Sequence, residues 1–108
     1  MEIEIKNLPK KSFNVYNNLH WANKKKFKDA IKLLVYNTTK KQFKGGYSLN
    51  FKFTFKGKLL DTVNVFHYCK IIEDSLFKQD NMNRKICVTV EKGRENKCLL
   101  TLKKIYDN

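Results

Sequence analysis

Acidic, basic and amide side chains gather between residues 61 and 81 of this 108-residue chain. The chain has only 10 acidic residues, and four of them lie in this stretch. The residues that could do chemistry here are Asp61, Asn64, His67, Lys70, Glu73, Asp74, Asp80 and Asn81. Cleavage of a phosphodiester with Mg²⁺ or Mn²⁺ needs carboxylates that converge on the cation, with a positive charge near the developing negative charge. These residue types could support that chemistry.

Spacing limits which of these carboxylates can act together. Asp61 and Asp74 lie 13 positions apart, about 20 Å along a helix, so they cannot share a metal within one subunit if both are helical. Asp61 and Asp80 flank the expected helix, and only loop folding or a dimer partner would bring them together. On spacing alone, Asp61 is better interpreted as a helix cap, and Glu73 and Asp74 as ion-pair partners of Lys70.

A second group of polar and aromatic residues lies between residues 12 and 28. Asn and Ser side chains can bond phosphate oxygens, Tyr can stack or bond a phosphate, and Lys neutralises one. The residues expected to contact DNA are Asn14, Tyr16, His20, Lys24, Lys25, Lys26 and Lys28, together with Asn64. The alternative is that the lysines form the solvated face of a helix, that Trp21 belongs to the core and that His20 only starts the helix.

The charge of the chain favours a polyanionic partner. Lys and Arg number 23 against 10 Asp and Glu, a net charge of +13. Such an excess repels itself in the compact state unless a polyanion relieves it, and nucleic acid is the commonest such partner. An anionic membrane surface is the second possibility. Codon bias towards Lys is the alternative explanation, but it does not account for the scarcity of acidic residues.

Other chemistries and locations fit the sequence less well. The two histidines and three scattered cysteines lack zinc-ligand spacing, so the cysteines are better interpreted as structural thiols. Gly45-Gly46 lacks the pattern of a phosphate-binding loop, and His67 and Cys69 do not face each other on a helix. No apolar run reaches the length of a membrane span, and no signal region opens the chain. The expected location is therefore the cytoplasm.

Four segments with strand patterns must position these residues. Residues 2–6 alternate apolar and polar side chains, and 47–55 alternate so regularly that every second residue is apolar. The segments 86–90 and 99–102 predict two more strands. They are joined through 92–96, which has the length of a hairpin connection and contains a turn glycine.

Two segments have helical periodicity. The first runs from about Trp21 to Thr38-Thr39, with an apolar stripe formed by Trp21, Phe27, Ile31, Leu34 and Val35. The second begins with Asp61 or Thr62 as N-cap and places Val65, Cys69, Ile72 and Leu76 towards the sheet. The order β-α-β-α-β-β predicts one compact α+β domain over residues 1–108, with a mixed sheet and two helices.

The two groups of residues together resemble the RusA family of Holliday-junction resolvases, crossover-junction endonucleases that are often phage-borne. The resemblance covers most of the chain. It is carried by Leu8-Pro9, Ser12–Tyr16 and His20-Trp21 near the start, and more strongly by Leu60–Asn64, Lys70–Leu76 and Asp80-Asn81. The resemblance implies a RusA-like fold and Mg²⁺- or Mn²⁺-dependent cleavage of four-way DNA junctions in recombination and repair. It also implies a homodimer, because symmetric cuts need two related active sites.

Carried over by residue, the resemblance makes Asp61 and Asp80 the metal ligands and Lys70 the lysine that stabilises charge at the scissile phosphate. Asp74 matches an acidic residue of the family's helix, and Asn64 matches the asparagine of its motif. Neither a membrane nor a small-molecule substrate is expected.

Two departures from the family pattern leave other functions open. Val63 stands where the family has a second carboxylate, and Asn81 replaces the second acid of a pair. The first alternative is a catalytically inactive relative that binds branched DNA or blocks another nuclease. The second is a general basic module that binds RNA or DNA without preference for structure.

Overall fold

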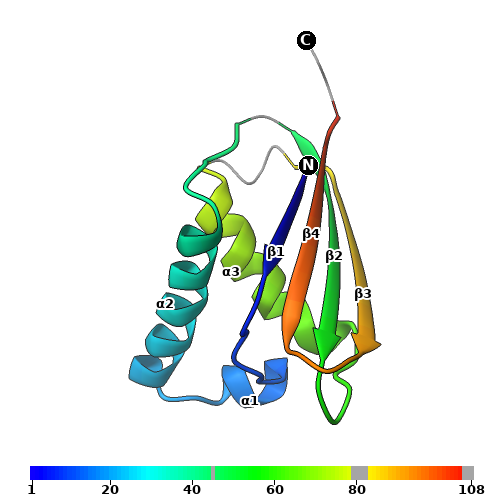
Figure 1. Ribbon diagram of the computed structural model, residues 1–108. Helices are drawn as coiled ribbons and strands as arrows, with labels where there is room; N and C mark the ends of the chain where they lie inside the picture. The colour runs from blue at the N-terminus through cyan, green and yellow to red at the C-terminus, as the bar shows by residue number, and fades with distance from the viewer. Residues whose placement is uncertain (45, 79–82, 106–108) are drawn as a thin grey trace.

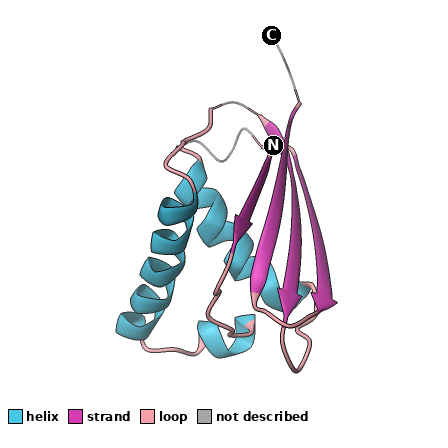
Figure 2. Ribbon diagram, in the orientation of Figure 1, coloured by secondary structure: helices cyan, strands magenta, loops and turns pink. Residues whose placement is uncertain are grey.

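The computed structural model describes residues 1–44, 46–78 and 83–105. Its elements are β1 (Glu2–Ile5), α1 (Phe13–Asn17), α2 (Trp21–Thr38), β2 (Tyr47–Phe55), the 3-10 turn η1 (Val63–Val65), α3 (Phe66–Leu76), β3 (Lys85–Lys92) and β4 (Lys97–Lys104). A layer of two long helices packs against a four-stranded sheet (Figures 1 and 2). The predicted α+β class is confirmed, and the short helix α1 and the turn η1 add to the two predicted helices.

The sheet has the strand order β1-β4-β2-β3. β4 is antiparallel to both of its neighbours, whereas β2 and β3 are parallel and are joined through α3. A parallel pair needs such a crossover, which is why a helix separates these two strands in the sequence. The sheet is therefore mixed, as predicted. The predicted hairpin between β3 and β4 is wrong, because β2 lies between them.

The connection at residues 93–96 passes over the end of β2. Two strand spacings are about 10 Å, which four residues can span. The Gly93 N–H donates to the Phe55 carbonyl at 3.0 Å. A Cβ placed on Gly93 would overlap Cγ2 of Thr54, so the crossing requires a residue without a side chain. A connection of hairpin length thus joins β3 to β4, although β2 lies between them in the sheet.

The core lies on one face of the sheet. From Leu49 onwards, every second residue of β2 is fully buried, and successive phenylalanine rings of this strand stack 6.0 Å apart. The buried sheet residues are Ile3, Ile5, Leu49, Phe51, Phe53, Phe55, Cys98, Leu100 and Leu102. The two long helices cover them with Phe27, Ile31, Val35, Tyr68, Ile72 and Leu76. The period-two alternation of β2 is what makes the core one-sided.

The apolar stripe of α2 differs from the prediction at its first residue. Phe27, Ile31 and Val35 are buried, but Trp21 is 71% exposed. Trp21 and Phe27 are six positions apart, which places the two side chains about 120° apart around the helix axis. Trp21 therefore belongs to a different face of α2. In the described part of the chain, no helix combines the length and the apolar character that a membrane crossing needs.

Candidate nucleic-acid interface

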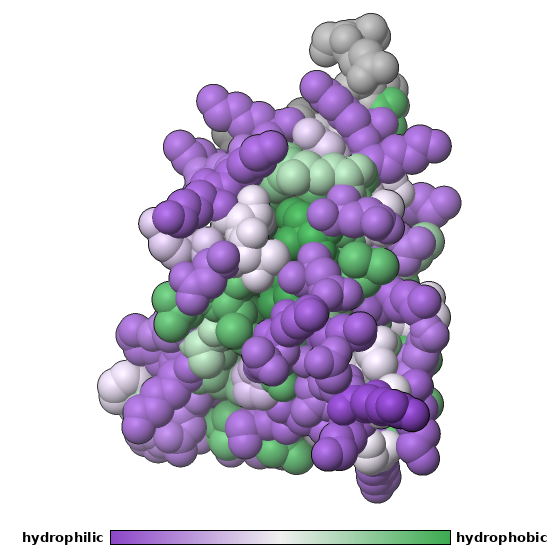
Figure 3. All heavy atoms as spheres, viewed as in Figure 1, coloured by the Kyte–Doolittle hydropathy of each residue, from purple (hydrophilic) through white to green (hydrophobic). Residues whose placement is uncertain are grey.

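One exposed face of α2 carries three basic side chains with an aromatic side chain at each end of the row. Trp21, Lys25, Lys28, Lys32 and Tyr36 follow one another at spacings of three or four residues, which aligns them along the helix. Trp21 is 71% exposed and Tyr36 is 57% exposed. We call these five residues the α2 stripe. Hydrophilic side chains also cover much of the molecular face that includes α2 (Figure 3). Lys32 and Tyr36 were not among the residues expected from the sequence to contact DNA, although their spacing from Trp21 was a usable signal.

A groove between α2 and α3 borders this stripe. It has a volume of about 360 Å³. Its rim carries Lys28 and Lys32 from α2, and Lys70 and Asp74 from α3. We call it the lysine groove. The Lys70 ammonium lies 3.2 Å from a carboxylate oxygen of Asp74, which confirms the predicted i,i+4 ion pair.

The remaining α2 lysines point in different directions. Lys25 lies on the stripe and donates to Asp29 at 2.8 Å, and this hydrogen bond lowers the pKa of the aspartate. The Lys24 ammonium lies 5.8 Å from the centroid of the Tyr16 ring. Lys26 is about 160° around the axis from Lys28, so it cannot face the lysine groove. The predicted lysine cluster is thus divided between two sides of the helix.

The floor of the lysine groove is aromatic. Tyr16 is only 8% exposed, and its ring packs against Phe27 and His67, with centroid distances of 5.3 and 5.0 Å. Tyr16 is therefore part of the packing beneath the groove, and the prediction that it contacts DNA does not fit this burial. His67 is 5% exposed, and its Nε2 donates to the Lys11 carbonyl at 2.9 Å. Burial lowers the pKa of His67 to about 4, so its imidazole is neutral at pH 7.

The other predicted contacts near the chain start are exposed. Asn14 lies on α1, and its carbonyl accepts a hydrogen bond from the Asn18 side chain at 2.9 Å. His20 is the N-cap of α2, where its Nδ1 accepts the Ala22 N–H at 3.3 Å. The interpretation of His20 as a helix-start residue is confirmed. The segment before α1 is tied to α3, because the Tyr68 hydroxyl donates to the Pro9 carbonyl at 2.6 Å.

Asp61 lies in a second depression, on the other side of α1. The depression has a volume of about 650 Å³ and is lined by Lys10, Lys11, Ser12, Val15, Lys58, Leu59, Leu60, Asp61 and Asn64. Asp61 Oδ1 accepts the Asn64 N–H at 3.0 Å, but the N-cap of η1 is Thr62, the other residue that the sequence offers for this role. α3 itself begins later than predicted, with Val65 as its N-cap. The Lys10 ammonium donates to the carbonyls of Lys56, at 2.8 Å, and Lys58. We call this site the Asp61 depression: one exposed carboxylate surrounded by lysines.

The predicted catalytic residues are not brought together among the described side chains. α1 separates the Asp61 depression from the lysine groove, where Lys70 and Asp74 lie. Asp80 and Asn81 fall outside the described residues. Over residues 1–44, 46–78 and 83–105, no three His, Cys, Asp or Glu side chains are placed to hold a metal ion. Of the two predicted Mg²⁺ ligands, the described residues include Asp61.

Glu73, expected from the sequence to be an ion-pair partner of Lys70, is a buried carboxylate. It is 8% exposed and accepts a hydrogen bond from the Asn83 side-chain amide at 2.8 Å. Asn83 in turn accepts the Tyr47 N–H at 3.0 Å, so it links α3 to the start of β2. The signal for burial was available, because residue 73 lies at helical spacing between Cys69 and Leu76 on the sheet-facing side.

The buried cysteines fit the structural role that the sequence predicts. Burial raises the pKa of the Cys69 thiol to about 12, and it raises the pKa of Cys98 further. Both thiols are therefore protonated at neutral pH and are poor nucleophiles or metal ligands.

Comparison with models of known protein families finds no match to this chain, and a search of curated proteins finds no matching relative.

Proposed function

We propose that the protein binds DNA through the α2 stripe and the lysine groove, and that it prefers branched DNA such as a four-way junction. The observation that carries this proposal is the α2 stripe, where Trp21, 71% exposed, shares a helix face with Lys25, Lys28 and Lys32. An exposed aromatic ring can stack on an unpaired base while neighbouring lysines bind phosphates. The net charge of +13 supports a polyanionic partner. The preference for branched DNA comes from the resemblance to the RusA family.

The test measures binding by fluorescence anisotropy over a range of salt concentrations. The DNA probes are a labelled four-way junction, a duplex with the sequence of one arm, and a single strand. The variant Lys28→Glu/Lys32→Glu removes two basic side chains from the lysine groove. The matched control, Lys103→Glu/Lys104→Glu, makes the same charge change at the far end of β4.

Each lost phosphate contact lowers the slope of log affinity against log salt by about 0.9. The groove variant is expected to lower this slope by about 2, whereas the control leaves it nearly unchanged. Equal losses in both variants would mean that net charge alone drives binding, and would contradict a located interface. Equal wild-type affinity for the junction and the duplex at matched salt would contradict the preference for branched DNA.

A second candidate function is metal-dependent cleavage of the same branched DNA. The observation that favours it is the exposed carboxylate of Asp61 in a depression lined by Lys10, Lys11 and Lys58. The resemblance to the RusA family makes the same prediction and adds Asp80 as the partner of Asp61.

Cleavage is tested on a synthetic four-way junction with Mg²⁺ or Mn²⁺, comparing wild type with Asp61→Asn and Asp80→Asn. Glu95→Gln, in the loop between β3 and β4, is the control that is expected to keep the activity. Paired symmetric nicks that both Asp variants abolish would support cleavage. Tight junction binding without nicks would leave DNA binding as the function.

A further inference from the structure

The outer strand β3 has an unusually open edge. It closes one side of the sheet and is eight residues long, whereas the strand at the other side, β1, has four residues. Ile86, Val88 and Val90 alternate along its helix-facing side, opposite Leu49, Phe51 and Phe53 of β2. No proline interrupts it. A long, regular edge of this kind tends to pair with another strand unless something covers it.

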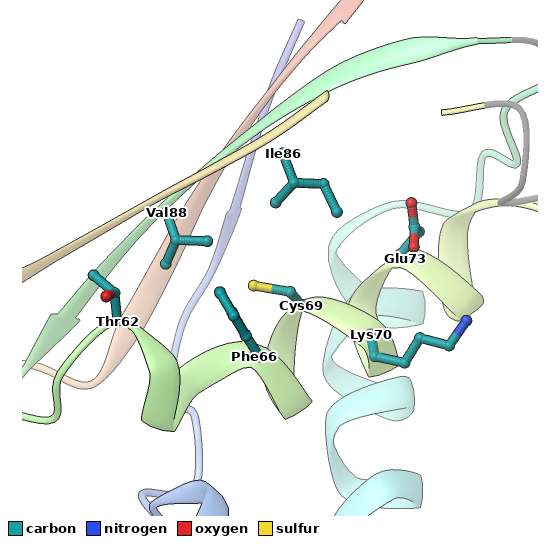
Figure 4. A pocket seen from close by; sticks show the side chains of 7 residues that line it. All are labelled: Thr62, Phe66, Cys69, Lys70, Glu73, Ile86 and Val88. Atoms are coloured by element: carbon teal, nitrogen blue, oxygen red, sulfur yellow. The ribbon is translucent and has the colours of Figure 1, made fainter. Parts of the chain in front are cut away.

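An apolar pocket lies beside this edge, between β3 and α3. Its volume is about 450 Å³. Ile86 and Val88 project from the strand towards Phe66 and Cys69 of the helix (Figure 4). Phe66 is 51% exposed and Ile86 is 49% exposed. A single copy of the chain therefore leaves apolar side chains in water both at the edge and beside it.

We propose that a second copy of this chain covers the edge, with the two β3 strands antiparallel across a two-fold axis at Val88. In an antiparallel pair, opposed residues must both point their backbone groups towards the partner or both point them away. Backbone groups alternate in direction along a strand, so opposed residues of two identical strands must both have even numbers or both have odd numbers. The two residue numbers of each pair then add to an even number. Two such registers pair seven residues of β3 each: one is centred on Val88 and pairs residues 85–91, and the other is centred on Thr89 and pairs residues 86–92.

The charges of β3 select the register centred on Val88. Lys85 lies opposite the partner's Glu91 and Glu91 opposite the partner's Lys85, so two ion pairs form on the open face of the sheet. Ile86 lies opposite the partner's Val90, and the two Val88 side chains meet on the axis. Opposed ion pairs and β-branched pairs both stabilise antiparallel strands. Moving the register by two residues in either direction loses both ion pairs.

This arrangement also accounts for the apolar pocket. A two-fold axis perpendicular to the sheet keeps both helix layers on one side, so the two pockets adjoin across the axis. Phe66 and Ile86 of each copy then face apolar side chains of the other. Both lysine grooves lie on that same side. This last point rests on the proposed function, for which a two-fold pair of grooves suits a branched DNA of similar symmetry.

The test is the oligomeric state of the DNA-free protein, measured by light scattering and sedimentation over a concentration series. Wild type is expected to have twice the 12.9 kDa mass of one chain. Lys85→Glu alone and Glu91→Lys alone each turn both ion pairs into like-charge contacts, and are expected to weaken the dimer about tenfold to a hundredfold. Mixing the two variants restores both ion pairs in the mixed dimer, so the dimer should recover.

The control Glu95→Lys makes the same charge change in the β3–β4 loop and is expected to leave the dimer intact. Glu91 also pairs with Lys52 at 2.9 Å in its own chain, but an exposed pair of this kind adds little to folding. A monomeric wild type, or a mixture that stays monomeric, would overturn the proposal. Failure of DNA binding would not affect this result, because no DNA is present.

Crosslinking gives a second measurement that does not depend on charge. In a Cys87→Ser background, Val88→Cys places two thiols opposite each other on the axis, within reach of a short bismaleimide. Lys103→Cys, on β4 and away from the edge, is the matched control. Covalent dimers from residue 88 and none from residue 103 are expected. Equal yields from both positions would refute the interface.

Discussion

Acidification is expected to destabilise the protein through His67, which is buried beneath the lysine groove. Its Nε2 donates to the Lys11 carbonyl, and its Nδ1 is buried without a hydrogen-bond partner in the described part of the chain. A proton on Nδ1 would therefore be a donor with no acceptor. Burial lowers the pKa of His67 from 6.5 to about 4 in the folded protein. In the unfolded chain, the imidazole has its ordinary pKa of about 6.5.

Between these two pKa values, the unfolded chain binds a proton that the folded chain does not. The free energy of unfolding therefore does not change through His67 above pH 6.5. It decreases as the pH falls from 6.5 towards 4, where the imidazole becomes protonated in both states. One pKa unit corresponds to about 1.4 kcal/mol, so the free energy of unfolding should fall by about 3 kcal/mol between pH 7 and pH 4 from this residue. That is a large share of the stability of a small domain, about 5–15 kcal/mol.

The measurement is urea denaturation of wild type and His67→Phe at several pH values from 7 to 4. Phenylalanine keeps the ring contacts with Tyr16 and Phe27 but cannot titrate. It also loses the hydrogen bond to Lys11, which costs about 1 kcal/mol at neutral pH. The carboxylates titrate in both proteins, so the difference between them isolates His67. If both lose stability in parallel from pH 7 to pH 4, the burial of a neutral imidazole is refuted.

Three other substitutions test the fold and the α2 stripe. Gly93→Ala is expected to lower the free energy of unfolding, measured by urea denaturation, by about 1–3 kcal/mol. Adding Thr54→Ser should recover much of that loss, because it removes the methyl group that the new Cβ would overlap. Simply additive effects of the two substitutions would contradict the crossing over β2. Phe53→Ala is expected to cost about 3–5 kcal/mol, because it empties a fully buried site between two stacked rings; a cost under 1 kcal/mol would mean that the core is packed differently. Trp21→Ala should change stability by less than about 0.5 kcal/mol but weaken single-strand and junction binding about tenfold, and unchanged anisotropy titrations would remove Trp21 from the interface.

Several features of the fold were predictable because they depend on residues close together in the sequence. The strict alternation of residues 47–55 determines a strand with one apolar face, whatever strands lie beside it, and β2 spans Tyr47–Phe55. The ion pair of Lys70 and Asp74 and the hydrogen bond from the Asn64 N–H to Asp61 are local in the same sense. Interactions within one or two helical turns need no information about the rest of the chain.

The parts of the candidate site were also predictable as residue types, but their grouping was not. Lysines near residue 25 and carboxylates near residue 70 stand out in the sequence. The sequence does not show that Lys28 and Lys32 border the same groove as Lys70, while Asp61 lies beyond α1. That grouping depends on how α2 packs against α3, which local periodicity does not specify. The same packing buries His67 and Tyr16 and leaves Trp21 exposed.

Strand order was decided only by the tertiary structure. The connection at residues 93–96 is short enough for a hairpin and also long enough to pass over one strand, so its length permits both arrangements. Placing β2 between β4 and β3 gives its phenylalanines apolar neighbours on both sides, Leu100 and Cys98 on β4 and Val88 and Val90 on β3. A hairpin would leave the most apolar strand of the sheet with fewer such neighbours. The sequence thus determined which faces are apolar, and the burial of those faces against one another determined which strands are neighbours.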